Sequence, residues 1–197
     1  MSIKKDINLL YEMGSIRFIE RTWRQFLNLS FANLAEHTLR VTWISLILAK
    51  HENVENTEKV IKMALIHDIS EGRTGDVNYL SRQYTVRNEE KAITDILKDT
   101  SLAPEFIDLW KEYEKLDTIE AQIVKDADNL DVDFELQEQK AKGGVLNDKW
   151  KDMRKYVSEN KLYTKTAKEL WNQLQDSDPN DWHMVGNNRF TSGDWKG

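Results

Sequence analysis

One stretch of the chain combines an apolar run with several ionisable side chains and two glycines. It reads Ala64-Leu65-Ile66-His67-Asp68-Ile69-Ser70-Glu71-Gly72-Arg73-Thr74-Gly75-Asp76. On a helix, His67 and Glu71 are four residues apart and share one face, whereas Asp68 lies about 100° round from His67. An ionised Asp directly after an apolar run is costly to bury unless a metal or another partner compensates its charge. The stretch therefore predicts a helix that ends in a turn and presents His67 and Asp68 to a cation. The alternative is a partly exposed helix end with ordinary polar side chains.

Composition limits the classes of function that fit. The chain has 197 residues, which is enough for one domain with a real core. Its net charge of -6 disfavours broad binding to nucleic acids or anionic membranes. It contains no cysteine, so any metal must take nitrogen and oxygen ligands. The first residues lack the apolar core of a signal peptide, and no apolar run approaches the ~20 residues that span a bilayer. We therefore expect a soluble, cytoplasmic protein with no nucleic-acid or membrane partner.

The fold class follows from the scarcity of strand patterns. Only two prolines occur, alternation of apolar and polar residues is rare, and residues that favour helices dominate. These features predict an all-α protein, a compact helical bundle. We expect helices over residues 7–26 (as one helix or two), 35–50, 58–71, 86–98, 105–115, 119–142, 147–159 and 164–175.

The chain divides into a helical domain, residues 1–175, and a mostly irregular tail, residues 176–197. The tail is rich in Asp, Asn, Gly and Ser, yet it contains Trp182, Phe190 and Trp195. Tails with aromatic side chains usually dock, so we expect this one to pack on the body or on a partner.

A second histidine is a candidate ligand. His37 lies on one helical stripe with Val41, Ile44 and Leu48. A lone histidine on an apolar face is usually a core residue. Because His37 is expected in the first turn of its helix, where side chains face a pocket, it is a candidate nitrogen ligand.

Three carboxylates in the expected helix 119–142 need an explanation, because Asp is a poor residue for helix interiors. Asp126, Asp128 and Asp131 follow Lys125 within seven residues. Asp128 is next to Ala127 and can border the core. We expect Asp126 and Asp131 to be solvated.

The candidate ligands, collected from three helices, are His37, His67, Asp68 and Asp128. Two imidazoles and two carboxylates suit a divalent transition metal or Mg²⁺. Glu71, one turn beyond the His67-Asp68 pair, could move a proton or orient a water molecule.

An Arg-aromatic segment precedes these residues. It reads Arg21-Thr22-Trp23-Arg24. A guanidinium beside an indole is a common way to hold a phosphate. On this segment alone, a surface Arg packed on a core Trp is the favoured alternative.

In these motifs the chain resembles the HD-domain metal-dependent phosphohydrolases. Their pattern is a His, then a His-Asp doublet, then a distant Asp, matched here by His37, His67-Asp68 and Asp128. The likeness is closest to the 5′-deoxynucleotidase branch, which has His-Asp-x-x-Glu-x-x-x-Gly-Asp, as at 67–76, and Val-Lys-x-x-Asp, as at 124–128. The branch also has an Arg and a Trp upstream, as at 21–23. The resemblance spans roughly residues 16–136.

The resemblance implies one divalent cation, Mn²⁺, Co²⁺, Fe²⁺ or Mg²⁺, bound by His37, His67, Asp68 and Asp128. It implies that Glu71 is the catalytic acid/base, and it suggests a homodimer.

The resemblance also implies the substrate contacts. Arg21 and Trp23 would hold the phosphate, with Arg24 as a rival, because some members place Arg directly before the Trp where this chain has Thr22. Asp76 would contact the sugar. The further substrate contacts that we predict are Asp68, Asp128, Val77, Asn78 and Tyr79.

The leading hypothesis is hydrolysis of deoxyribonucleoside 5′-monophosphates. A second hypothesis is hydrolysis of another nucleotide, such as a cyclic or alarmone nucleotide, although no extra His-rich cluster suggests a second metal. A third is a non-catalytic nucleotide-sensing protein. Glu71 argues against it, because a pure binding site needs no residue for proton transfer.

Overall fold

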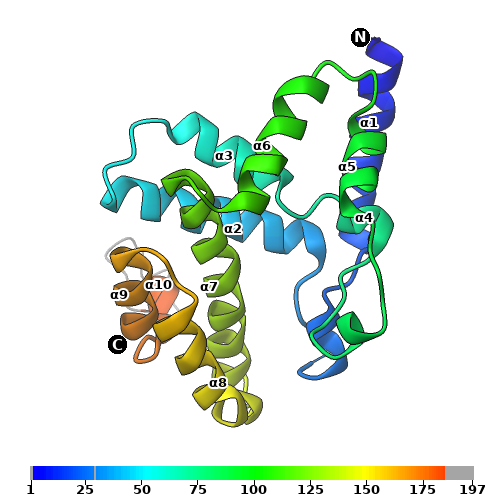
Figure 1. Ribbon diagram of the computed structural model, residues 1–197. Helices are drawn as coiled ribbons and strands as arrows, with labels where there is room; N and C mark the ends of the chain where they lie inside the picture. Colours follow the sequence, from blue (N-terminus) through cyan, green and yellow to red (C-terminus); the bar gives the residue numbers. More distant parts are fainter. Residues whose placement is uncertain (1, 29, 185–197) are drawn as a thin grey trace, which may run out of the picture.

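Two long helices, α2 (Leu34–His51) and α7 (Ile119–Ala141), cross at the centre of the molecule and pack against each other (Figure 1). The computed structural model describes residues 2–28 and 30–184. α3 (Thr57–Ile66) packs on α2 and α7, and α6 (Ala103–Lys115) packs on α3 and α7. These four helices surround the main core, so residues at their ends can meet at one place.

The remaining helices cover this centre from two sides. On one side α8 and α9 pack along α7, and on the other α1 lies beside α5 (Figure 1). Their bounds are α1 Ile3–Ser15, α4 Glu71–Thr74, α5 Glu89–Leu97, α8 Leu146–Asn160, α9 Lys165–Leu174 and α10 Asp181–Met184, with 3-10 helices at Ile16–Phe18, Thr22–Gln25 and Ser81–Gln83. Residues 2–28 and 30–184 contain no β-strand. The all-α prediction is confirmed.

Local sequence signals explain where the central helices begin. Asn33 and Glu36 form a capping box at the start of α2, which places His37 in the first turn as expected. Thr118 caps α7 by accepting a hydrogen bond from the backbone N–H of Ala121. At α3 the cap is Asn56 and not Thr57, which is the first helical residue.

The buried stripe of α7 explains why this helix is central. Ile123, Ala127 and Leu130 are fully buried among the side chains of α2, α3 and α6. Ile119 is 41% exposed because it begins the helix. Further along α7, a second apolar cluster forms around Val132 and Leu136.

Helix α1 differs from its prediction. It ends at Ser15, and two 3-10 helices replace the rest of the expected 7–26 helix. Ile7 is 46% exposed and Leu10 is 70% exposed. Leu9 is buried instead. The reason is that α1 lies at the edge of the bundle and buries only one narrow face (Figure 1).

The predicted helix 58–71 is also interrupted. α3 ends at Ile66, a turn covers 67–70, and α4 begins at Glu71. Within the turn, backbone N–H groups bond three residues back, as when Glu71 N–H donates to the Asp68 carbonyl at 2.9 Å. Such bonds wind the chain more tightly than an α-helix. His67 and Glu71 therefore do not share one continuous helix face.

The C-terminal predictions have mixed outcomes. α10 adds a short helix to the tail, and Trp182 is 74% exposed, so it does not dock on the body. Phe190 and Trp195 lie outside the described residues. On α8, Met153 and Tyr156 are exposed. No helix within residues 2–28 and 30–184 has the length and apolar character needed to cross a membrane.

Candidate metal centre

Two histidine rings meet where α2 begins and α3 ends. His67 Nδ1 lies 2.7 Å from the carbonyl oxygen of Ala64. A carbonyl only accepts, so this nitrogen donates its proton and Nε2 presents a lone pair. His37 Nδ1 lies 2.6 Å from Asp131 Oδ2, which fixes the same tautomer. The two Nε2 atoms are 3.3 Å apart, an arrangement in which a shared cation satisfies both lone pairs.

Two carboxylates complete the cluster. Asp68 Oδ2 lies 3.4 Å from His37 Nε2 and 3.3 Å from His67 Nε2. Asp128 Oδ1 lies 3.4 Å from His37 Nε2. One ligand atom from each of the four residues falls within 4.8 Å of every other. The set of two nitrogens and two oxygens fits a divalent cation, and it unites the four residues predicted from the sequence.

The charges of the cluster favour a cation. Burial and the charge of Arg21 lower the pKa of His37, but hydrogen bonds that its ring donates to Asp128, Asp131 and Asp68 raise it well above its ordinary value. Burial alone would raise the pKa of Asp68, but the neighbouring His67 and His37 outweigh burial and hold the pKa well below its ordinary value. The carboxylates therefore stay charged and attract positive charge to the Nε2 atoms.

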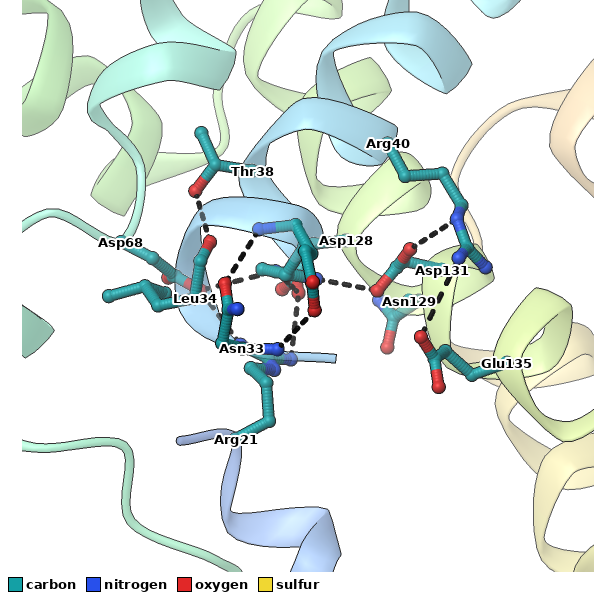
Figure 2. A network of polar contacts seen from close by, with 12 residues as sticks. Arg21, Asn33, Leu34, Thr38, Arg40, Asp68, Asp128, Asn129, Asp131 and Glu135 are labelled. Atoms are coloured by element: carbon teal, nitrogen blue, oxygen red, sulfur yellow. Dashed lines mark hydrogen bonds and ion pairs between the residues drawn. The ribbon is translucent and has the colours of Figure 1, made fainter. Parts of the chain in front are cut away.

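The His37 side of the cluster has outer support (Figure 2). Asp131, which we predicted to be solvated, is buried and holds the His37 ring. Arg40 in turn lies 3.4 Å from Asp131 Oδ1 and 3.5 Å from Glu135 Oε1. The prediction for Asp131 is wrong because α7 turns this carboxylate toward α2.

Glu71 lies beside the cluster with one oxygen free. Its Oε1 accepts a hydrogen bond from Arg87 Nη1 at 3.1 Å, whereas Oε2 is buried without a hydrogen-bond partner. Burial first, and then the charges of Asp68 and Asp76, raise the pKa of Glu71 to about 9. A carboxyl group in this position carries a proton at neutral pH and can donate it.

Arg21 stands among the carboxylates (Figure 2). Its Nη1 donates to Asp68 Oδ2 at 3.2 Å, and its Nη2 lies 4.0 Å from Asp128 Oδ1. It is only 6% exposed, which rules out the alternative of a surface Arg. The rival Arg24 instead bonds the Phe31 carbonyl at 2.8 Å and does not line the cavity described next.

A cavity of about 340 Å³ opens beside the cluster. It brings together every predicted site residue except His37, which lies fully buried behind it. The predicted residues in its wall are Arg21, Trp23, His67, Asp68, Glu71, Asp76, Val77, Asn78, Tyr79 and Asp128. Three buried side-chain atoms without a hydrogen-bond partner also belong to wall residues: Arg21 Nε, Glu71 Oε2 and Tyr113 Oη. Arg21 Nε has an ion-pair contact with Asp76 at 3.6 Å and Glu71 Oε2 has one with Arg21 at 3.9 Å, but none of the three atoms makes a hydrogen bond. Buried polar atoms without a hydrogen bond are costly, so their gathering here indicates a place where a polar ligand binds.

Some predicted contact residues have bonds within the protein. Asp76 Oδ2 accepts from the Thr22 N–H at 3.0 Å. Asn78 is saturated, because its Nδ2 donates to Thr22 and Gln25 and its Oδ1 accepts from two backbone N–H groups. Both side chains therefore fix the Arg21 segment against the 76–81 loop.

Several wall residues were not predicted from the sequence. Arg87 lies in the loop before α5, Tyr113 on α6 and Arg154 on α8, and none of them belongs to a motif. Lys125, by contrast, lies within the quoted Val-Lys motif, and its Nζ donates to Asp128 Oδ2 at 2.8 Å. Its place in that motif was the signal in the sequence that could have identified Lys125 as a site residue.

Asp126 corrects another prediction. It is fully buried and accepts hydrogen bonds from Tyr163 N–H and from both the N–H and the hydroxyl of Thr164. Thr164 caps α9, so Asp126 attaches the start of α9 to α7.

Comparisons with known proteins agree with this geometry. A family model described as HD domain matches residues 13–175. The chain is 30% identical over 132 residues to a protein of Danio rerio named 5′-deoxynucleotidase HDDC2, covering 64% of this chain but only 65% of that protein. It is 30% identical over 130 residues to a Dictyostelium discoideum protein of the same name, covering 60% of this chain and 68% of that one.

Solved structures share the fold. A conserved hypothetical protein from Pyrococcus furiosus superposes with a TM-score of 0.70 at 29% identity, covering 86% of this chain and 98% of that one. A predicted metal-dependent phosphohydrolase from Magnetospirillum magnetotacticum superposes with a TM-score of 0.68 at 24% identity, covering 88% and 93%. Because the family model covers most of the helical bundle and all four clustered ligands, this chain belongs to the HD domain family.

Proposed function

We propose that this chain is a metal-dependent phosphomonoesterase that hydrolyses deoxyribonucleoside 5′-monophosphates to a deoxynucleoside and phosphate. The observation that carries the proposal is the group of four nitrogen and oxygen ligand atoms within 4.8 Å of one another, beside a cavity that is lined by Glu71 and Arg21. The choice of substrate is supported by relatives named 5′-deoxynucleotidase.

The cluster suits one divalent cation, held by His37, His67, Asp68 and Asp128. When bound, such an ion supplies charge neutralisation for a phosphate and lowers the pKa of a coordinated water. Mn²⁺, Co²⁺, Fe²⁺ and Mg²⁺ are the candidates. The three transition-metal ions accept both imidazole nitrogen and carboxylate oxygen, and Mg²⁺ prefers the oxygen ligands.

Arg21 and Glu71 divide the remaining work. The Arg21 guanidinium can bind phosphate oxygens, because it lines the cavity and its Nε has only a long contact to Asp76, at 3.6 Å, and no hydrogen bond. As water adds to phosphorus and the bond from phosphorus to the 5′-oxygen breaks, the leaving oxygen needs a proton and the attacking water gives one up. Glu71, whose pKa is raised to about 9, can donate the first proton and accept the second.

The far part of the cavity would hold the nucleoside. One oxygen of Asp76 is occupied by Thr22 N–H, and the other can accept a sugar hydroxyl. Trp23 is a firm wall, since its ring packs edge-on against Trp150 at 5.1 Å between centroids. A 2′-hydroxyl pressed against such a wall can cost about 10²-fold in kcat/KM.

A phosphate-release panel tests this function. Deoxy- and ribonucleoside 5′-monophosphates, a cyclic nucleotide and an alarmone are each assayed with Mn²⁺, Co²⁺, Fe²⁺ or Mg²⁺. We expect the deoxynucleoside 5′-monophosphates to react fastest. Equal rates on deoxy- and ribonucleotides would reject the deoxynucleotidase assignment, and no release from any substrate would reject a phosphomonoesterase.

Glu71→Gln tests the proton transfer. We expect the variant to keep its metal and to lose turnover by about 10²-fold or more, the usual scale for a general acid. Glu114→Gln is the matched control, because Glu114 lines the same cavity and is not assigned to proton transfer. Loss of metal from the Glu71 variant, measured by elemental analysis, would place Glu71 among the ligands instead.

We also propose a homodimer. Leu39, Trp43 and Ile47 recur every four residues on α2 and are all exposed, so they form an apolar stripe that a second copy could cover. Sedimentation that shows only a 23 kDa species at micromolar concentration would contradict this. The lack of nucleic-acid or membrane partners stays a prediction from the net charge of -6, and a cytoplasmic location stays a prediction from the absence of a signal-peptide pattern in the sequence.

A further inference from the structure

Tyr113, in the last turn of α6, has a buried hydroxyl without a hydrogen-bond partner in the protein. The residue is 4% exposed and lines the cavity beside the four candidate metal ligands. A buried hydroxyl with no partner carries a desolvation penalty, which an acceptor bound in the cavity would remove. The hydroxyl is therefore in a position where a bound ligand could supply the missing hydrogen-bond acceptor.

The surroundings of Tyr113 place it at the reacting end of the cavity. Its ring packs edge-on against the ring of His67, with 5.7 Å between centroids. Lys125 Nζ lies 5.9 Å from the centre of the Tyr113 ring and 2.8 Å from Asp128 Oδ2. Tyr113 thus touches one predicted ligand and lies close to a second, on the side where a phosphate would meet the cation.

The chemistry of the hydroxyl makes it a donor. Lys125 is the charged neighbour of the hydroxyl, and its ammonium group only donates, so it offers no acceptor for the phenol proton. A phenol keeps that proton at neutral pH and can donate it to a ligand. A phosphate dianion offers several acceptor oxygens and almost no donors, so the two groups are complementary.

We propose that Tyr113 contacts the substrate and donates a hydrogen bond from its hydroxyl to a non-bridging phosphoryl oxygen. This inference rests on the proposed function, because it assumes that a phosphate occupies the cavity. It assigns Tyr113 a role in holding the phosphoryl group, alongside Arg21.

Tyr113→Phe tests the inference because it removes only the oxygen atom. The full chain loaded with Mn²⁺ is titrated with inorganic phosphate, and the melting temperature is measured without phosphate. We expect phosphate to bind about 10-fold more weakly, the scale for a hydrogen bond to a charged group. We expect kcat/KM to fall at least as much, the metal content to stay the same, and the melting temperature to stay equal or rise. Tyr156→Phe, at an exposed position on α8, should change none of these values.

The outcomes separate the two proposals. A lower melting temperature with unchanged phosphate affinity would mean that the hydroxyl bonds within the protein, and would overturn the inference. So would a wild-type chain that binds no phosphate. If phosphate binds and Tyr113→Phe weakens it, while no nucleotide is hydrolysed, the proposed function fails and the role of Tyr113 stands.

Discussion

Asp126 and Asp128 lie two residues apart on α7, yet their surroundings are opposite in kind. The oxygens of Asp126 accept from three uncharged donors of Tyr163 and Thr164, at 2.7 to 2.8 Å. Those of Asp128 face Lys125, His37 and Arg21, all of which are or can become cations. Burial raises the pKa of Asp126, whereas at Asp128 the charge of Lys125 and the hydrogen bond of His37 outweigh burial and lower it.

The difference follows from the geometry of a helix. Two residues span about 200° round the axis, so the two carboxylates point to opposite sides of α7. One side of α7 faces α9, and the other side faces the remaining candidate metal ligands. A buried Asp in a helix interior therefore does not reveal its role, which depends on the helix that faces it.

The largest effect should separate these two carboxylates directly. We expect Asp128→Ala to lose its metal and all measurable turnover, because a ligand is gone while Arg21 and Lys125 remain in the site. Asp126→Ala is the matched control and should keep full metal occupancy by elemental analysis. Metal loss in both variants, or in neither, would contradict the claim that Asp128 is a metal ligand and Asp126 is not.

Asp126 should instead matter for stability. We expect Asp126→Ala to lower the free energy of unfolding by about 3 kcal/mol, because three donors at the start of α9 lose their acceptor in a buried place. Urea denaturation measures the change. A loss under about 0.5 kcal/mol, the usual range for surface substitutions, would show that water replaces the carboxylate at no cost.

Glu135, one turn beyond Asp131 on α7, should make stability depend on pH. Burial raises its pKa from 4.5 to about 7, with Asp131 and Glu138 adding to the shift and Arg40 opposing it. The folded chain therefore holds this proton more tightly than the unfolded chain, so stability falls as pH rises from about 4.5 to 7.

Glu135→Gln should remove this loss. At pH 8 we expect the variant to be more stable than the wild type by roughly 2 kcal/mol, and near pH 4.5 the two should be equal. Urea denaturation at both pH values measures the difference. Glu138→Gln is the control, since Glu138 also contacts Arg40 but is more exposed. A difference that does not change with pH would contradict the assignment to Glu135.

The smallest expected effect is on metal affinity, when the carboxylate of Asp131 that holds the His37 ring is changed. Asp131→Asn keeps an acceptor for the ring but removes the charge, so we expect metal affinity to fall by about 10-fold, the lower end for partners of metal ligands. Asp133→Asn is the control, because Asp133 pairs with Arg154 on α8 at 2.6 Å and contacts no predicted ligand. Chelator competition gives both affinities, and equal values would leave His37 positioned by packing alone.

The helical class, the positions of most helices and the four candidate ligands could be predicted from the amino-acid sequence alone. These depend on local signals, namely apolar periodicity, caps such as Thr118, and motifs such as His67-Asp68. A short motif carries this information because its spacing is set by the helix it lies on.

Which carboxylates are buried, and what they bind, depends on how the helices pack in the folded molecule. Asp126 and Asp131 were predicted to be solvated, yet one holds Thr164, 38 residues later, and the other holds His37, 94 residues earlier. Tyr113 and Arg154 reach the cavity from helices without a motif. Such pairings come from the crossing of α7 with α2, α6, α8 and α9, and a helix face carries no record in its own sequence of which neighbour will cover it.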